Sequence, residues 1–225
     1  MSKPVQSIEH QIKSKRDIIK EGLCEYYDML IRKFEHEEII QTTDLITVKF
    51  LGTDTGYITL VDIKCEEHVT PAHFLKFYEV CKIEAVKITP ECTGVRELCV
   101  EEGKYKTSVE TFKFPLVSER YAVLTAYHIP NYGGEGMHMY VASDRGNEDR
   151  NTEEFLGKGY VGSRVYVHTE IAVYHCIKKD GKIYMRWLTE IGNKGIPQWI
   201  FLKLQLMKYP GLFKGIYSVL ARPLE

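Results

Sequence analysis

The sequence contains neither a long apolar run nor a surplus of charge of one sign. Its densest apolar stretch, Trp199–Leu202, is four residues long, whereas a membrane-spanning helix needs about 18 apolar residues. The N-terminal residues lack the apolar core of a signal peptide. Lysine and arginine total 30 and aspartate and glutamate total 31, but a surface that binds nucleic acid is densely basic. We therefore expect a cytoplasmic protein that does not bind nucleic acid.

Sequence signatures of metal binding and catalysis are also missing. The 6 cysteines contain no Cys-x-x-Cys pair, and the 8 histidines are dispersed along the chain. Disulfide frameworks are typical of small secreted chains, so we expect reduced thiols. The chain has no nucleophile elbow, no phosphate-binding glycine loop and no His-Glu-x-x-His motif. We expect no metal, no cofactor and no enzymatic activity.

Aromatic residues are abundant. The chain has 15 Tyr, 9 Phe and 2 Trp, or 12% of all residues. Such rings favour strands and bury large surfaces. The composition therefore indicates a strand-rich globular protein with an enclosed interior.

The period of the apolar residues predicts the first elements. Helical spacing extends over residues 5–38, within an N-terminal helical region at 1–38. Two β-branched segments, 45–51 and 57–63, flank a glycine-containing turn and predict a hairpin. Thr70-Pro71 then begins a second helix, because Thr is a good N-cap and Pro suits the first helical position.

A series of strands and a final helix follow. The strands are predicted near residues 95–101, 106–114, 120–128, 137–142, 160–177 and 182–191. The last helix, residues 197–220, is apolar on nearly its whole circumference and must therefore be covered on more than one side. Because no Pro/Gly/Ser-rich linker divides the chain, we expect one domain over residues 1–225. The predicted fold is α+β, a curved antiparallel sheet wrapped around a long C-terminal helix, which can enclose a cavity.

Two segments carry a resemblance to a known family. Phe114–Arg120 resembles the Phe-Pro-Leu/Met-Ser-x-Arg-Asp segment of START domains, the lipid-transfer domains related to steroidogenic acute regulatory protein. Asn193–Ile200 is similar to the entry of that family's last helix, and the order of elements matches its helix-grip fold. The resemblance implies a single START-like domain with a lipid ligand in an internal tunnel closed by the C-terminal helix.

Departures from the family pattern leave the lipid class open. Tyr121 stands where the family has Asp, and Gly192 stands where the second motif begins with Asp. In the sterol-binding branch a Glu and an Arg pair inside the tunnel. Glu110 matches that Glu, but the Arg position falls on Ala126. Residues 88–92 lack the Arg and Trp of the phosphatidylcholine-binding branch, so phospholipid, sterol and ceramide all remain possible ligands.

The candidate lipid contacts come from four strands and the last helix. Alternation within the strands places one set of side chains on the predicted inner face. The alternatives are a solvent-facing Glu110, a hydrogen-bonded wall histidine at His175 and an ordinary apolar core. The predicted contacts are Glu110, Ala122, Ala126, Val173, His175, Met185, Trp187, Thr189, Ile200, Leu204 and Met207.

Two further segments relate to ligand exchange. The glycine-rich loop with Tyr132, Gly133, Gly134 and Gly136 occupies the place of the family's gating loop, although it is equally a flexible hairpin turn. From residue 194 onward, five basic residues stand against one acidic residue. With the aromatic residues of the last helix, this excess suits transient contact with an anionic membrane surface.

These features together predict a monomeric intracellular lipid-transfer protein. An apolar tunnel removes the cost of about 0.8 kcal/mol per CH₂ for moving an acyl chain through water. Two alternatives remain open. One is a ligand-binding regulatory module that transfers nothing, and the other is a small-molecule enzyme, such as a cyclase, on the same fold.

Overall fold

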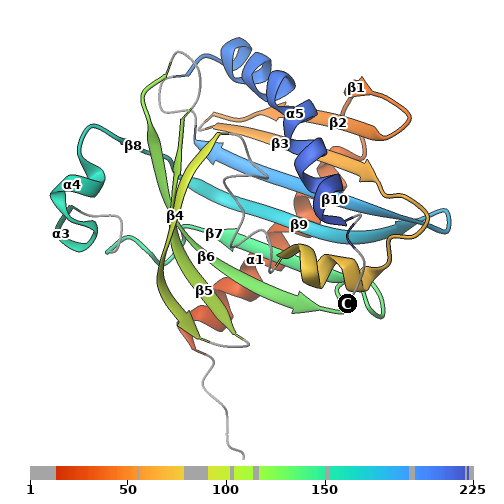
Figure 1. Ribbon diagram of the computed structural model, residues 1–225, viewed down its shortest axis with the longest axis horizontal. Coiled ribbons are helices and arrows are strands. Elements are labelled where there is room, and N and C mark those ends of the chain that lie inside the picture. The colour runs from red at the N-terminus through yellow and green to blue at the C-terminus, as the bar shows by residue number, and fades with distance from the viewer. Residues whose placement is uncertain are drawn as a thin grey trace, which may run out of the picture.

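One antiparallel sheet with helices on both faces forms the body of the protein (Figure 1). The computed structural model describes residues 14–54, 56–78, 91–101, 104–113, 117–149, 153–192, 196–220 and 222. Its strands are β1 (Ile39–Thr42), β2 (Ile46–Gly52), β3 (Gly56–Lys64), β4 (Cys92–Glu101), β5 (Tyr105–Phe112), β6 (Arg120–Pro130), β7 (His138–Ser143), β8 (Val165–Tyr166), β9 (Thr169–Lys179) and β10 (Lys182–Gly192). Their order in the sheet is β1-β2-β3-β10-β9-β7-β6-β5-β4, and β8 joins β6 in parallel.

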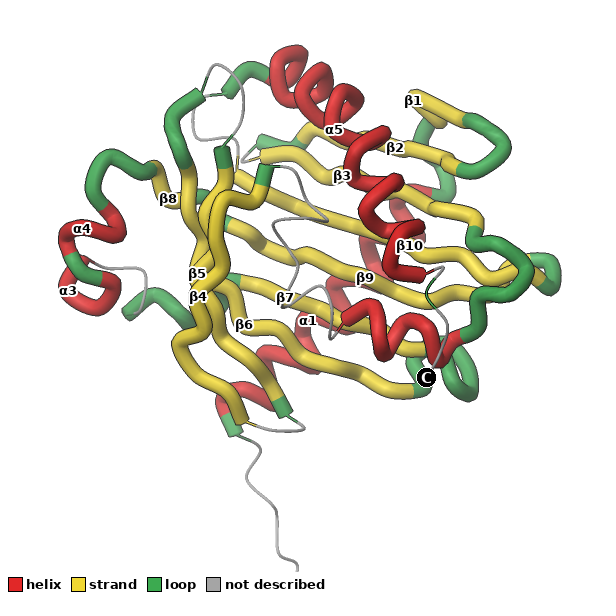
Figure 2. Tube along the Cα trace, in the orientation of Figure 1, coloured by secondary structure: helices red, strands yellow, loops and turns green. Residues whose placement is uncertain are grey.

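The two long helices lie on opposite faces of this sheet. The helices are α1 (Lys15–Phe34), the helix at residues 71–78, α3 (Glu153–Leu156), α4 (Lys158–Val161) and α5 (Gln198–Leu220). In Figures 1 and 2, α5 and residues 71–78 cross the front of the sheet, while α1 lies behind it. Within the described residues, no helix is long and apolar enough to cross a bilayer. The predicted α+β helix-grip architecture is confirmed.

A helical stripe attaches α1 to the sheet. Leu23, Tyr27, Leu30 and Phe34 recur at three- and four-residue spacing and are all buried. Ser14 caps the helix, because its side chain accepts a hydrogen bond from the backbone N–H of Asp17. The stripe packs on a set of strand residues that define the α1 face: Ile58, Leu60, Tyr127, Met139, Val141, Ile171, Val173 and Leu188.

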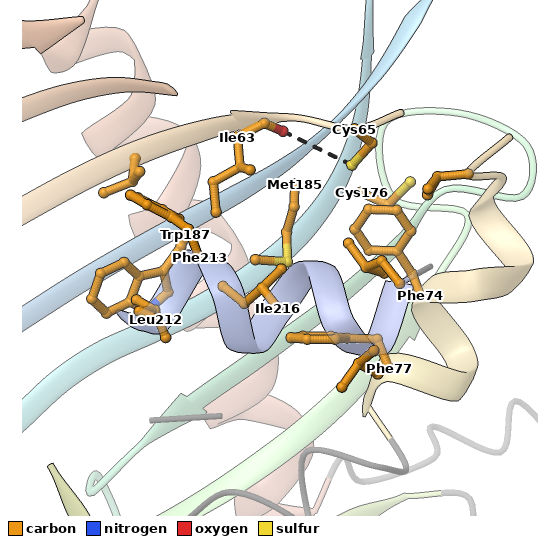
Figure 3. Close-up of a cluster of buried hydrophobic side chains, with 14 of the residues drawn as sticks. Ile63, Cys65, Phe74, Phe77, Cys176, Met185, Trp187, Leu212, Phe213 and Ile216 are labelled. Carbon is orange, nitrogen blue, oxygen red and sulfur yellow. Dashed lines mark hydrogen bonds between the residues drawn. The ribbon is translucent and has the colours of Figure 1, made fainter. Parts of the chain in front are cut away.

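The C-terminal half of α5 packs on the other side of the sheet, here called the α5 face. Trp187 and Met185 of β10 lie under Leu212 and Ile216 of the helix (Figure 3). Burying each such side chain contributes about 1.5–3 kcal/mol. The sheet residues of this cluster are Val48, Val61, Ile63, Cys176, Met185 and Trp187, and Phe74 and Phe77 of the helix at residues 71–78 complete it.

Two parts of the predicted order differ from the structure. The strand predicted over residues 160–177 is broken, because α4 extends to Val161 and only β8 and β9 follow. Gly157 and Gly162 have positive φ values of 88° and 42°, which favour turns over a continuous strand. The edge strand β1 was not predicted, because all of its residues are exposed and it lacks an alternating pattern.

Candidate ligand-binding site

The register between β9 and β10 decides which side chains share a face. Directly paired residues of antiparallel strands point to the same side of a sheet. Trp187 pairs with Tyr174, whereas Leu188 pairs with Val173 and Arg186 with His175. Because Trp187 packs on α5, Val173 and His175 lie on the α1 face. The prediction that Val173 and His175 face the C-terminal helix is therefore wrong.

His175 binds protein groups on the α1 face. Its Nε2 lies 3.0 Å from the carbonyl oxygen of Tyr132, and its Nδ1 lies 2.8 Å from the hydroxyl of Tyr27. A carbonyl only accepts, so Nε2 carries the proton and Nδ1 accepts from Tyr27. Burial lowers the pKa of His175 to about 4. His175 is thus a neutral residue that joins α1, β9 and the loop containing Tyr132.

Glu110 and Ala122 are direct neighbours on β5 and β6. On β6, Tyr121 and Val123 pack with Leu156 of α3, and Tyr127 packs with α1. Alternation therefore directs Ala122 and Ala126 to the α5 face, and Glu110 with them. Burial raises the pKa of Glu110, while the charge of Lys106 and a hydrogen bond from Ser108 act in the opposite direction. The burial favours the neutral form of this carboxyl.

A row of small side chains crosses the α5 face. Ala126 pairs with Ala142, Ala142 pairs with Ala172, and Ala172 pairs with Thr189 of β10. Thr189 in turn pairs with Thr59 of β3. The three alanines remain partly exposed, although neighbours on the opposite face, such as Val141 and Val173, are buried. Small side chains therefore leave accessible space along this row.

One hydroxyl in the row has no partner among the described residues. Thr59 is 1% exposed, and its Oγ1 makes no hydrogen bond within the described part of the chain. A buried hydroxyl without a partner is costly, so such a group is available to a bound molecule. Met185 and Trp187, in contrast, belong to the filled cluster beneath α5.

The first turns of α5 close over the sheet near this row. Phe201 is buried, and its ring stacks on Tyr57 at 4.5 Å between centroids and approaches Phe50 at 6.2 Å. Ile200 is half-buried. The side chains of the predicted contacts Leu204 and Met207 lie outside the described part. Phe201 was not predicted as a contact, although it lies in the apolar run that predicted the helix.

The glycine-rich loop is a hairpin turn between β6 and β7. Its backbone uses positive φ values at Asn131, Gly133, Gly134 and Gly136, which glycine adopts at little cost. The Asn131 side chain accepts a hydrogen bond from the Gly136 N–H at 2.8 Å. The ring of Tyr132 packs edge-on against Tyr27 and His175. The loop is therefore fastened to the α1 side, and its role as a lid stays a prediction.

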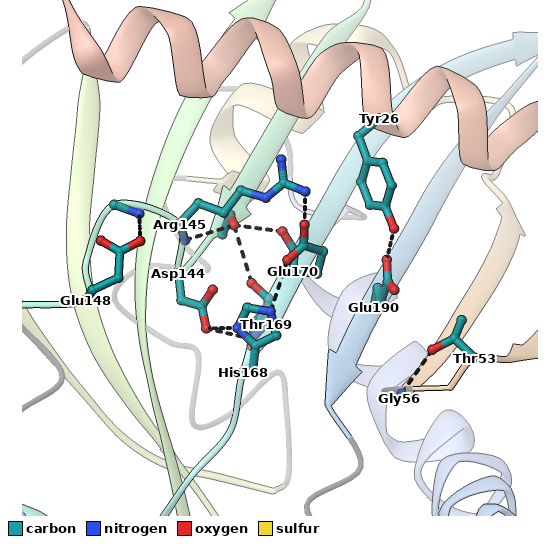
Figure 4. Close-up of polar contacts among 12 residues, drawn as sticks. Tyr26, Thr53, Gly56, Asp144, Arg145, Glu148, His168, Thr169, Glu170 and Glu190 are labelled. Atoms are coloured by element: carbon teal, nitrogen blue, oxygen red, sulfur yellow. Dashed lines mark hydrogen bonds and ion pairs between the residues drawn. The ribbon is translucent and has the colours of Figure 1, made fainter.

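A separate polar pocket of about 200 Å³ lies beside α1 (Figure 4). The hydroxyl of Tyr26 donates to Glu190 at 2.6 Å. His168 lies between Asp144 and Glu170, at 2.7 and 3.0 Å. These polar groups are paired with one another, and no cluster of potential metal ligands occurs in the described ranges.

Comparison with known proteins identifies the fold. No family model and no curated protein sequence matches the chain. Human StAR-related lipid transfer protein 5 superposes with a TM-score of 0.74 over 93% of this chain and 98% of its own, at 12% identity. This chain has the START fold. Human STARD10 gives a TM-score of 0.68 at 11% identity, covering 94% of this chain and 81% of its own.

A third START domain gives the same result. The lipid transfer and protein localization domain of human StarD13 has a TM-score of 0.61 at 13% identity, covering 92% of this chain and 98% of its own. The TM-scores of the three domains establish a common START fold, whereas identities this low carry no information about the ligand. The predicted resemblance is therefore confirmed at the level of the fold.

The two START motif segments lie partly outside the described residues, which omit 114–116 and 193–195. The described part of the second motif leads into α5, and the hydroxyl of Tyr57 donates to the Ile196 carbonyl at 2.6 Å. This bond joins the start of the helix to β3. The described part of the first motif ends at Arg120, the first residue of β6.

From the sequence, Arg120 is recognisable only as the last residue of the first motif. Alternation from Ala122 places its side chain on the α5 face of the START sheet. The side chain is 6% exposed. The alternation along β6 is enough to predict the face on which the Arg120 side chain lies. The burial and the hydrogen bonds of Arg120 depend on the tertiary structure.

Proposed function

We propose that this protein binds one lipid or sterol-like molecule between the α5 face of the sheet and α5, and that it transfers this ligand between membranes. The observation that carries the proposal is the registered row of Ala126, Ala142 and Ala172, whose small side chains remain partly exposed on this face. An acyl chain placed there avoids about 0.8 kcal/mol of hydration cost per CH₂. The relatives in structure named as lipid transfer proteins support this proposal by analogy of fold.

Membrane contact is proposed at the start of α5. Trp199 is 69% exposed there, and Lys203 one turn later is exposed as well. Phe201, between them, is buried against Tyr57. An exposed tryptophan beside a cation suits the interface of an anionic membrane. We propose that this end of the helix contacts the membrane transiently during ligand exchange.

Exchange also needs an opening. We propose that the loop of Tyr132 to Gly136 and helix α5 separate from the sheet at the membrane and close again in solution. The loop is held by the contacts of Tyr132 with Tyr27 and His175, so opening at this point breaks those contacts. The protein acts as a cytoplasmic monomer without enzymatic activity.

A vesicle-to-vesicle transfer assay tests the proposal. Donor vesicles carry labelled sterol, phosphatidylcholine or ceramide, and appearance of the label in acceptor vesicles is measured with and without protein. We expect accelerated transfer of at least one of these lipids. Binding without transfer identifies a regulatory module, and failure of all three lipids to bind or move contradicts the proposal.

A further inference from the structure

Arg120 lies on the same strand and the same face as Ala126 of the row of small residues, six positions earlier along β6. Its strand neighbours in register are Phe112 on β5 and Val165 on β8. The following residue, Tyr121, faces the opposite side and packs with Leu156 and Tyr166. Arg120 is therefore on the α5 face, two pairs along the register from Glu110 and Ala122.

Arg120 is buried, and none of the described residues places a carboxylate against it. Its Nε makes no hydrogen bond, and no ion pair of Arg120 occurs among the residues that the structure describes. Two half-buried arginines of this chain are paired with carboxylates: Arg186 donates to both oxygens of Asp62 at 2.7 and 2.6 Å, and Arg164 donates to Glu119 at 2.7 Å. Burial lowers the pKa of Arg120. A buried cation of this kind is costly until an anion joins it.

The described charged groups near Arg120 on the α5 face do not supply this anion. Lys106 of β5 is paired with Glu97 of β4. Glu110 interacts with Lys106 and Ser108, and burial favours its neutral form. A neutral Glu110 does not repel an anion bound at Arg120 and can donate a hydrogen bond to it.

We propose, building on the lipid-binding function above, that Arg120 binds an oxyanion of the ligand, a carboxylate or a phosphate. The planar guanidinium presents donors that match the two oxygens of either group. The chain of the ligand then extends from Arg120 along Ala122 and the row of Ala126, Ala142 and Ala172. The proposed ligand is thus an amphiphile with an anionic head group and one or more apolar tails.

Three probes with similar apolar tails and different head groups test the head-group preference: oleate, oleyl phosphate and oleyl alcohol. Dissociation constants are measured by calorimetry for the wild-type protein, Arg120→Met, Arg120→Lys and the control Arg164→Met. The wild type should bind oleate or oleyl phosphate at least about tenfold more tightly than oleyl alcohol. Comparison of the affinities for the two anions identifies carboxylate or phosphate as the preferred head group.

Arg120→Met should abolish this preference, and Arg164→Met should keep it because Arg164 lies away from the α5 face and is paired with Glu119. Equal binding of all three probes by the wild type overturns the proposal and leaves lipid binding intact. Failure of every probe and of the transfer assay overturns the proposed function itself. If Arg120→Met does not fold, Arg120→Lys provides the test. Weaker binding of only the two anionic probes supports the proposal, and an equal change in the affinity for all three probes overturns it.

Discussion

The hydroxyl of Tyr27 on α1 donates a hydrogen bond to Nδ1 of His175 on β9, across 2.8 Å. His175 uses its other nitrogen to donate to the carbonyl of Tyr132 at 3.0 Å. One buried imidazole thus joins the helix behind the sheet to the loop between β6 and β7. This network stabilises the α1 side and contributes to the pH dependence of stability.

Acidification should destabilise the protein through His175. Its pKa is about 4 in the folded chain, against 6.5 for an unperturbed histidine. Between these values the unfolded chain binds a proton that the folded chain does not, so stability is lost as pH falls from 6.5 to 4. The loss amounts to roughly 3 kcal/mol. Urea unfolding across this range should show a weaker pH dependence for His175→Gln, while exposed His36→Gln should behave like the wild type.

Tyr132→Ala should loosen the hairpin loop. The substitution removes the ring contacts with Tyr27 and His175 and the hydrogen bond to the Cys24 carbonyl. Amide exchange over residues 131–137 should therefore accelerate. If the loop is a lid, the rate of lipid transfer should rise as well. Faster amide exchange with an unchanged rate of lipid transfer contradicts a lid function of this loop.

Trp199→Ala should weaken binding to anionic vesicles. Trp199 is the most exposed large apolar side chain in the described residues, and tryptophan is favoured at the membrane interface. Cosedimentation with phosphatidylserine vesicles should show less bound protein, with thermal stability unchanged. Phe155→Ala is the matched control, because Phe155 is also exposed but lies on α3. An equal loss in both variants contradicts a specific contact at α5.

Glu110→Gln should remove a component of the pH dependence of stability whose sign is opposite to that of His175. Burial raises the pKa of Glu110 above 4.5, so the folded chain keeps a proton that the unfolded chain releases. Stability of the wild type should therefore fall as pH rises above 4.5, and Glu110→Gln should lack this component. Urea unfolding at pH 4 and pH 7 measures the difference, with exposed Glu66→Gln as control. An identical pH dependence of unfolding in Glu110→Gln and wild type contradicts a raised pKa of Glu110.

Periodicity made most of the fold predictable, and the limits of that signal explain the errors. The stripe of Leu23, Tyr27 and Leu30 repeats at helical spacing because only one side of α1 meets the sheet. On β9 both alternate sets are apolar, since α1 covers Val173 and α5 covers the side of Tyr174 and Cys176. Alternation alone therefore could not assign the inner face of this strand, and only pairing with β10 did.

The polar part of the site was less predictable. Glu110 was found through a resemblance, and its neighbour Ala122 through alternation. Arg120 lies on the same strand and face as Ala122, but its lack of a carboxylate partner among the described residues is a property of the packed structure. No local pattern in a sequence reports the absence of such a contact.

The central claim, a lipid held on the α5 face, is tested most directly by native mass spectrometry of the protein purified from a lipid-containing host. Ala172→Phe fills the row of small residues, and Ala72→Phe places the same ring on the exposed surface of the helix at residues 71–78. We predict one lipid per chain in the wild type and in Ala72→Phe, and loss of that lipid in folded Ala172→Phe. A wild-type protein without lipid, or full retention of lipid by Ala172→Phe, would contradict the claim.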